Sequence, residues 1–395
     1  MVVHTRVPSA YPVGQRGPQM TTTDDTLMSE AIALSAAARL RAAPNPWVGC
    51  VLVRDGLVIG TGATQAPGGR HAESEALAAA GDAHGATAYV TLEPCSHHGR
   101  TPPCADALID AGVVRVVAAL EDPDPDVAGQ GVARLRASGI DVVVGVGADQ
   151  VRRSLAPYLH QRRTGRAFAL IKTAMSLDGR TSAADGTSQW ITGPEARADA
   201  HQLRAESQAI VVGPATARAD RPSLTVRDAD LPDAGQPLRV LLDAKGTVPV
   251  EGPLFDLDLA PTVVFTTTAA LESARVAWSQ SGVDIETVGP GVDGRGVDLD
   301  AVLRALGSER GVLQAMVEGG GKLHGALIAE GLANRIVTYV APVVLGERGR
   351  AVIAYPGPET LDDAPRWRVT ETRAIGADVR ITYEPIAAMD VEVMA

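Results

Sequence analysis

The first part of the chain alternates short apolar runs with segments that carry a helical apolar stripe. Runs such as 48–53 are continuous in small and β-branched apolar residues, which is typical of strands buried on both faces. Asp55-Gly56 follows this run and favours a hairpin turn into a second strand. Strands are predicted at 48–53, 57–61, 86–92, 113–120 and 140–146, and helices at 24–41, 72–80, 104–111 and 132–137. This alternation predicts an α/β layer with a mostly parallel sheet.

A second series of the same kind follows a helix and polar linker that run through 158–165. Its predicted strands are 168–174, 209–213, 239–242, 262–266, 314–317 and 335–340, and its predicted helices are 195–204, 270–280, 299–306 and 321–330. Segments 228–236 and 289–296 show no periodicity and are interpreted as surface loops. The second half is therefore also predicted to be an α/β unit.

The length of the chain indicates more than one domain. Its 395 residues exceed the size at which a single core usually stops growing, so we predict one domain over 24–165 and a second over 166–395. Residues 1–23 lack an apolar segment and are predicted to be a disordered tail rather than a signal peptide, with Met20 as an alternative start. No stretch reaches the roughly 18 apolar residues of a membrane span.

Charge and cysteine usage exclude several classes of partner. The net charge is −11 and no basic cluster is present, which argues against a nucleic acid held through many phosphates. The chain has three cysteines, and two of them, Cys95 and Cys104, belong to the metal-ligand motif described next. A disulfide framework is therefore not supported. We therefore expect a reducing, cytoplasmic setting.

A candidate metal-ligand motif consists of His71, Cys95 and Cys104. Imidazole and thiolate groups are ligands that Zn²⁺ prefers, and a catalytic zinc typically keeps three protein ligands and an open position for water. Glu73 follows the histidine by two residues. His-x-Glu, followed by Pro-Cys and a second Cys, is the signature of zinc-dependent deaminases, in which the glutamate is the general acid and base. We predict one zinc ion per chain and a hydrolytic deamination.

Neighbouring residues have more than one interpretation. A structural zinc site is the alternative to a catalytic one, and it would normally need a fourth protein ligand. His97 and His98 lie between the two cysteines with Arg100, and we predict substrate contacts for them rather than metal binding. Asn45, between two prolines, is a candidate for binding a pyrimidine edge or for closing its own turn. Cys50 is interpreted as a buried apolar residue.

Several longer motifs surround these residues. They are Pro-Asn-Pro-x-Val-Gly at 44–49, the segment 91–104 with its Ser-His-His-Gly-Arg-Thr-Pro-Pro loop, and Asp122-Pro123 followed by Val-Ala-Gly at 127–129. Together they closely resemble the deaminase half of the bifunctional riboflavin biosynthesis proteins of the RibD/RibG type. Asp124 stands where we expect Asn in relatives, at a turn position that should leave the chemistry unchanged.

The resemblance implies a substrate for the deaminase. It is 2,5-diamino-6-(5-phosphoribosylamino)pyrimidin-4(3H)-one, so the enzyme would be a hydrolase acting on a cyclic amidine. Asn45, His97 and Arg100 would bind the base and the ribose phosphate, with arginine suited to a phosphate. The loop between the cysteines would then serve substrate recognition.

Two segments carry the second half. Residues 318–326 follow an apolar strand and open a helix, and their consecutive glycines would let a phosphate approach the backbone. The segment is neither G-x-G-x-x-G nor a P-loop, and a flexible turn before a core helix is an equal alternative. Residues 213–227 are predicted to be a polar loop between strands, for which a solvated surface is the alternative.

Together with 172–180 and 188–192, these segments resemble the reductase half of the same family. The resemblance covers about 24–384 and implies an N-terminal cytidine-deaminase-like α/β/α domain followed by a dihydrofolate-reductase-like α/β domain. It implies NADPH-dependent reduction of 5-amino-6-(5-phosphoribosylamino)uracil to the ribitylamino product. The implied NADPH contacts are Ala174, Trp190, Thr216, Asp220, Gly320, Gly321, Lys322, Leu323, His324, Gly325 and Ala326. The implied substrate contacts are Lys172, Ser188, Arg204, Leu224, Arg227 and Glu318.

Some points stay open at this stage. Either Lys172 or Asp220 could assist proton transfer, and Arg221 stands where relatives are expected to carry the second Asp of Asp-Asp-Pro. The family implies small phosphorylated pyrimidine substrates, no nucleic-acid or membrane partner, and a cytoplasmic homo-oligomer, either dimer or tetramer. Two competing hypotheses are a deaminase acting on a polynucleotide and a zinc-stabilised scaffold that binds a nucleotide.

Overall fold

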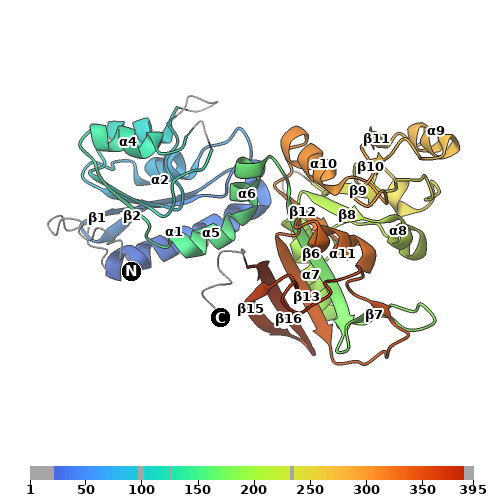
Figure 1. Ribbon diagram of the computed structural model, residues 1–395. Helices are drawn as coiled ribbons and strands as arrows, with labels where there is room; N and C mark the ends of the chain where they lie inside the picture. Colours follow the sequence, from blue (N-terminus) through green and yellow to red (C-terminus); the bar gives the residue numbers. More distant parts are fainter. Residues whose placement is uncertain (1–21, 97–101, 125–126, 232–234, 387–395) are drawn as a thin grey trace, which may run out of the picture.

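The computed structural model describes residues 22–96, 102–124, 127–231 and 235–386. Figure 1 shows two α/β halves, coloured blue to green for the first and green to red for the second, each built on its own main sheet. The predicted α/β class is therefore confirmed for both halves. Among the described residues, no helix is long and apolar enough to cross a membrane.

The first half is built on a five-stranded sheet in the order β2-β1-β3-β4-β5. Its strands are β1 (Gly49–Arg54), β2 (Leu57–Ala63), β3 (Thr87–Val90), β4 (Arg115–Ala118) and β5 (Asp141–Val144). β1 and β2 form the predicted antiparallel hairpin, and Asp55 and Gly56 both have positive φ at its turn, +53° and +76°. β3, β4 and β5 run parallel to one another, as the alternation of strands and helices predicted.

Six helices accompany this sheet in the described part of the first half. They are α1 (Thr22–Ala42), α2 (Ala72–Ala80), α3 (Cys104–Asp110), α4 (Gln130–Ala137), α5 (Ala148–Ser154) and α6 (Ala156–Thr164). Two glycines of β2 let α2 lie directly on the hairpin, because a Cβ at Gly60 or Gly62 would collide with backbone carbonyls of that helix. This close approach fixes the N-terminus of α2 near the carboxyl end of β3, where the predicted zinc ligands lie.

The second half has a nine-stranded sheet in the order β11-β10-β9-β8-β12-β6-β13-β16-β15. Its strands are β6 (Phe168–Ser176), β8 (Ala209–Val212), β9 (Leu238–Leu242), β10 (Thr262–Thr266), β11 (Asp284–Thr287), β12 (Gln314–Val317), β13 (Arg335–Ala341), β15 (Trp367–Ile375) and β16 (Asp378–Pro385). The strands from β11 to β13 pair in parallel, whereas β16 and β15 add an antiparallel hairpin at one edge. A separate small pair joins β7 (Arg180–Ser182) to β14 (Arg350–Ala351).

Five α-helices, a 3-10 turn (Pro253–Phe255) and a π-helical turn (Ala305–Glu309) complete the described part of the second half. The α-helices are α7 (Pro194–Ala205), α8 (Pro214–Asp220), α9 (Glu272–Gln280), α10 (Leu299–Arg304) and α11 (Gly321–Ala329). α11 begins immediately after β12, so its N-terminus and the end of β12 meet at one edge of the sheet. Several of the residues predicted for the second site lie at this edge.

The structure corrects three local predictions. Residues 213–227 are not a loop throughout, because Pro214 at the first position and a left-handed Arg221 at the end bound helix α8. The C-terminal strands β15 and β16 were not predicted, because β15 is mostly exposed and lacks a continuous apolar face. Helix α1 begins at Thr22, so the last two residues of the predicted tail are helical. Residues 1–21 lie outside the described part.

Candidate active sites

The three predicted metal ligands come together at the carboxyl end of β3. His71 is the extended residue that precedes α2, Cys95 follows β3, and Cys104 is the first residue of α3. His71 Nδ1 lies 3.6 Å from Cys95 Sγ and 3.4 Å from Cys104 Sγ. Cys104 N also donates to Cys95 Sγ at 3.4 Å, so the start of α3 holds both sulfurs in place.

This donor set fits a zinc ion. Zn–N and Zn–S bonds of about 2.0 and 2.3 Å in tetrahedral geometry put N and S ligands roughly 3.5 Å apart. The distances from His71 Nδ1 to both sulfurs match that value, and the three ligand atoms all lie within 4.8 Å of one another. Among the described residues the group consists of these three ligands, the number that a catalytic zinc site typically takes from the protein.

Glu73 lies in the first turn of α2 and is 4% exposed. Burial, followed by the charge of Cys95, raises the pKa of Glu73 to about 7. A group that titrates near neutral pH can both accept and release a proton under working conditions. The carboxyl is therefore placed beside the metal ligands with the properties of a general acid and base.

A cavity of about 410 Å³ opens onto this site. Asn45 lines it, and the backbone N–H of Asn45 donates to the Ala42 carbonyl at 2.8 Å, so the residue also belongs to a turn. The other lining residues are Pro44, Pro46, Val48, Thr64, Pro67, Gly68, Gly69, His71, Glu73, Leu92, Glu93, Cys95, Asp122, Asp124, Val127, Tyr158 and Arg162. The cavity is large enough for a small ligand.

Three further predictions have different outcomes. His97, His98 and Arg100 lie outside the described residues, so their predicted roles stay predictions. Cys50 is fully buried on β1 and unbonded, which confirms the interpretation as a core residue. Asp124 lines the cavity, so it is more than the turn position that the sequence suggested.

In the second half, Lys172, Arg204 and Glu318 meet at the end of β12. Arg204 on α7 donates to both carboxylate oxygens of Glu318, with Nη2 at 2.7 Å from Oε2. Burial alone would raise the pKa of Glu318, but Arg204, and then Lys172, hold that pKa at about 2. Burial lowers the pKa of Lys172, and the nearby Glu318 opposes this shift. Three predicted substrate contacts therefore form one charged cluster.

Arg227 and Leu224 approach this cluster from the segment after α8. Arg227 N donates to His201 Nδ1 at 3.0 Å, and His201 lies one turn before Arg204 on α7. Arg204 Nη1 donates to the Thr225 carbonyl at 2.9 Å. Leu224 is buried with φ +53°, so its side chain is part of the core at this point. The segment 223–227 is thus fastened to α7.

Ser188, Trp190 and Ala174 occupy the surrounding positions. Ser188 and Ala174 are half-buried, and Ala174 lies on the same side of β6 as Lys172, two residues earlier. Trp190 is 68% exposed, and the guanidinium of Arg197 lies 4.6 Å from its ring centroid. No described interaction joins Trp190 to the charged cluster, so its predicted cofactor role is not tested by these contacts.

The glycine-rich turn before α11 lies against α8. A Cβ at Gly320 would lie 3.5 Å from Thr216 Oγ1, so these two predicted cofactor positions are neighbours. No described side chain caps the first turn of α11, which leaves N–H groups available for an anion, as the diphosphate of NADPH would require. The residues present therefore fit the cofactor at this turn.

Packing also explains part of the glycine pattern. A Cβ at Gly321 would lie 2.5 Å from the Ala351 carbonyl oxygen, and one at Gly325 would lie 2.6 Å from that of Ala354. His324 is buried and its Nδ1 lies 3.0 Å from the Val352 carbonyl oxygen, so Nδ1 carries the hydrogen. The remaining members of the segment are the exposed Lys322 and the half-buried Leu323 and Ala326.

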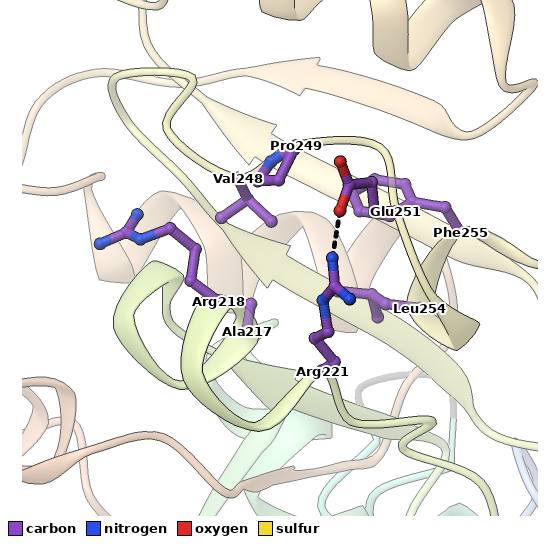
Figure 2. A pocket seen from close by; sticks show the side chains of 8 residues that line it. All are labelled: Ala217, Arg218, Arg221, Val248, Pro249, Glu251, Leu254 and Phe255. Atoms are coloured by element: carbon purple, nitrogen blue, oxygen red, sulfur yellow. Dashed lines mark hydrogen bonds and ion pairs between the residues drawn. The ribbon is translucent and has the colours of Figure 1, made fainter. Parts of the chain in front are cut away.

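Asp220 and Arg221 end α8, and both are exposed. Figure 2 shows that Arg221 points toward Glu251, with which it forms an ion pair, across a cavity of about 240 Å³. The residue that replaces the expected second Asp therefore has a local partner. Neither side chain contacts the Lys172 cluster among the described interactions.

Sequence reasoning missed several residues at both sites. Tyr158 and Arg162 of α6 line the first cavity, although the segment was interpreted as a helix and polar linker with no role at the site. Arg197 and His201 share one face of α7 with Arg204, and their spacing of three and four residues was a usable signal. The contacts of α6 had no such signal, because they depend on how a connecting helix returns to the sheet.

Comparison with known families gives two matches. Residues 21–120 match the cytidine and deoxycytidylate deaminase zinc-binding region, and residues 167–381 match the RibD C-terminal domain. The chain is 45% identical over 363 residues to the riboflavin biosynthesis protein RibD of Chlamydia trachomatis, covering 90% of this chain and 94% of that one. It is 41% identical over 367 residues to the RibD of Escherichia coli, covering 90% and 98% of the two chains.

Solved structures agree with these matches. A RibD structure from Acinetobacter baumannii is 36% identical, with a TM-score of 0.81 over 92% of this chain and 99% of that one. A Thermotoga maritima structure, described as a diaminohydroxyphosphoribosylaminopyrimidine deaminase and 5-amino-6-(5-phosphoribosylamino)uracil reductase, is 31% identical, with a TM-score of 0.79 over 92% and 99% of the two chains. These likenesses extend over both halves.

Proposed function

The chain belongs to the RibD family of bifunctional riboflavin biosynthesis proteins, and on that premise we propose which substrates and residues serve its two activities. It combines a zinc-type deaminase domain with an NADPH-dependent reductase domain. We propose that the domains span 24–165 and 166–395. The end of α6 at Thr164 and the start of β6 at Phe168 support a boundary between them.

For the deaminase we propose 2,5-diamino-6-(5-phosphoribosylamino)pyrimidin-4(3H)-one as substrate, as in the Thermotoga maritima relative. His71, Cys95 and Cys104 would hold the zinc, and their mutual distances support this role. Zinc, when bound, activates water as a nucleophile near neutral pH. Asn45 lines the cavity and would bind the pyrimidine edge.

Glu73 would move the protons of this reaction. Its carboxylate would accept a proton from the attacking water and pass it to the departing nitrogen, so that a C–O bond replaces a C–N bond and ammonia leaves. The pKa of about 7 supports both transfers, because neither proton state is strongly disfavoured. The burial of Glu73 would keep bulk water from competing for the same proton. We keep His97 and Arg100 as proposed substrate contacts.

For the reductase we propose 5-amino-6-(5-phosphoribosylamino)uracil as substrate. NADPH, when bound, supplies the hydride. Thr216 and the turn at Gly320 and Gly321 would hold its phosphates, together with the other positions implied by the family. Arg204 and Arg227 would bind the sugar phosphate. The bond of the Arg204 guanidinium to Glu318 and that of the Arg227 backbone N–H to His201 support a fixed position for both residues.

Lys172 is the better candidate for the proton donor of this step. Burial lowers the pKa of its ammonium group, which makes proton release easier, and the carboxylate of Glu318 keeps it protonated beforehand. Asp220, by contrast, is exposed at the end of α8. We propose that Lys172 Nζ donates to the oxygen of the opening ribose ring.

One coupled assay tests the proposal. Zinc-loaded protein is given the diaminopyrimidinone phosphate, and ammonia release is followed before NADPH is added and its oxidation is recorded. Ammonia release is expected first and NADPH oxidation second. A chelator should stop ammonia release, while pre-deaminated substrate is still reduced. Absence of both signals would refute the proposed substrates.

We also propose that the chain acts in the cytoplasm as a homo-oligomer, a dimer or a tetramer. β15 at the edge of the nine-stranded sheet is a suitable surface for pairing. Sedimentation of the native protein measures the oligomeric state directly.

A further inference from the structure

The deaminase cavity is strongly acidic for a site that must accept a phosphate. Four carboxylates line it, those of Glu73, Glu93, Asp122 and Asp124. Among its described lining residues, the only side chain with a permanent positive charge is Arg162. A doubly charged phosphate would be repelled by this wall unless a cation compensates. Within the described part of the site Arg162 can supply that charge, in addition to Arg100, which lies outside the described residues.

Two of the carboxylates already have structural tasks. Glu93 accepts from the backbone N–H groups of Gly129 and Val132 at 2.9 and 3.0 Å, and from that of Asp122. Asp122 accepts from the Tyr158 hydroxyl, with Oδ2 at 3.0 Å. These bonds tie helix α6 to the cavity wall, because Tyr158 belongs to that helix.

Arg162 is one turn further along α6. Its guanidinium lies over the Tyr158 ring, 5.1 Å from the centroid, and its Nε lies 3.2 Å from Asp124 Oδ2. Nε is buried, yet it makes no hydrogen bond within the described part of the chain, so the ion pair is close in distance but poorly aligned. The cation is therefore held at the cavity with donor capacity left over.

We propose that Arg162 is a specificity-determining residue of the deaminase site and binds the phosphate of its substrate. This inference rests on the proposed function, which supplies a phosphorylated pyrimidine. A guanidinium has five N–H donors in a planar fork and matches a phosphate in bidentate geometry. Tyr158 and Asp124 hold this fork beside the cavity before the substrate arrives, which reduces the entropy lost on binding.

The arrangement gives the linker helix a role in recognition. α6 ends at Thr164, directly before the second half begins at β6, and the Gln161 side chain donates to the Gly307 carbonyl of that half at 3.1 Å. A residue of the connecting segment thus completes the first active site. The phosphate is the part of the substrate that both reactions leave unchanged, so it is a suitable anchor.

The test compares Arg162→Gln with Arg163→Gln, an exposed neighbour on the same helix. Deamination is measured with the phosphorylated substrate and with its dephosphorylated ribosyl counterpart. For Arg162→Gln, kcat/KM on the phosphorylated substrate should fall on the order of 10- to 100-fold, the range for one lost hydrogen bond to a charged group, chiefly through KM. The dephosphorylated compound should be deaminated as by the wild type, and Arg163→Gln should leave both unchanged.

Other outcomes contradict the inference in distinguishable ways. Equal losses on both substrates would show that Arg162 only supports the fold, and an unchanged preference for the phosphate would place the anion elsewhere. Zinc content and NADPH oxidation, measured on the same preparations, verify that the variant is folded. If the wild type deaminates neither compound, the proposed function fails, whereas a phosphate preference that is lost in Arg162→Gln supports both.

A double variant adds an electrostatic check. In Arg162→Gln the carboxylate of Asp124 is left without this cation at the cavity, so Arg162→Gln/Asp124→Asn should recover part of the lost kcat/KM on the phosphorylated substrate. No recovery would contradict a charge-based role for the pair.

Discussion

Glu73 owes its position to the first turn of a helix rather than to the metal. His71 stays extended with ψ 165°, α2 begins at Ala72, and Glu73 follows in the first helical turn, buried beside Cys95 and Cys104. This order places a carboxyl next to the ligands without adding it to them. The His-x-Glu spacing in the sequence is enough to predict this arrangement. When the histidine directly precedes a helix, a glutamate two residues later falls in the first helical turn, beside the histidine.

Glu73→Gln should therefore separate proton transfer from metal binding. Glutamine keeps the size of the side chain but cannot carry the proton, so ammonia release should fall by about 10²- to 10⁴-fold while zinc content stays the same. Reduction of pre-deaminated substrate should be unaffected. The control is Glu75→Gln. Glu75 lies in the same helical turn, with Oε1 3.7 Å from Arg70 Nη1, and this variant should deaminate normally. Normal deamination by Glu73→Gln would remove the acid–base role.

Glu318 provides a pH-dependent prediction at the same scale. Its pKa in the folded chain is about 2, below the ordinary 4.5, because Arg204 and Lys172 favour the carboxylate over the effect of burial. A depressed pKa contributes stability that is fully present above about pH 4.5 and is lost as the pH falls toward 2.

Glu318→Gln leaves the half-buried Arg204 and Lys172 without their carboxylate and should lower the free energy of unfolding by about 3–5 kcal/mol at pH 7. Urea unfolding between pH 7 and 3.5 should show this difference narrowing below pH 4.5. A difference that stays constant over this range would mean that Glu318 has an ordinary pKa in the folded chain.

At the scale of elements, the pattern of apolar residues predicted the buried strands but did not predict the exposed ones. β12 and β8 are buried at every position and were recognisable as apolar runs. β15 has intermediate or exposed residues throughout, so its pairing with β16 is determined by backbone hydrogen bonds that no side-chain pattern reveals. α8 was missed because its charged and hydroxyl residues suggested a loop, although Pro214 at its first position was a start signal.

The turn before α11 allows the two interpretations of its glycines to be separated. A Cβ at Gly320 meets only Thr216 Oγ1 at 3.5 Å, whereas one at Gly321 meets the backbone of Ala351 at 2.5 Å. Gly320→Ala should leave stability within about 0.5 kcal/mol but raise the KM for NADPH, if the backbone here approaches the cofactor. Gly321→Ala should lower the free energy of unfolding by about 1–3 kcal/mol through overpacking. If the KM for NADPH is unchanged in Gly320→Ala, the glycines of this turn serve packing and not cofactor binding.

For the whole molecule, the sequence predicted two α/β units but not how one contacts the other. The contacts are single polar side chains that meet residues far away in the chain. Arg39 of α1 forms an ion pair with Glu206 at 3.3 Å and donates to Gln314 Oε1 at 3.3 Å, both in the second half. The guanidinium of Arg39 also lies 5.2 Å from the Trp47 ring centroid. No local pattern marks such a residue, because its partners are determined by how the two halves meet.

Arg39→Met tests whether this contact couples the unfolding of the two halves. Methionine keeps the apolar stem against Trp47 but removes the charged donors. The contact between the two halves should therefore be weakened by about 1.5–3 kcal/mol of free energy. Deaminase and reductase activities, measured after heating to increasing temperatures, should then be lost at temperatures that differ more than in the wild type. Arg41→Met is the matched control, because Arg41 donates at 3.0 Å to the Thr64 carbonyl within the first half. If both activities of Arg39→Met still disappear together, the halves are coupled by other contacts, such as the bond from Gln161 to the Gly307 carbonyl.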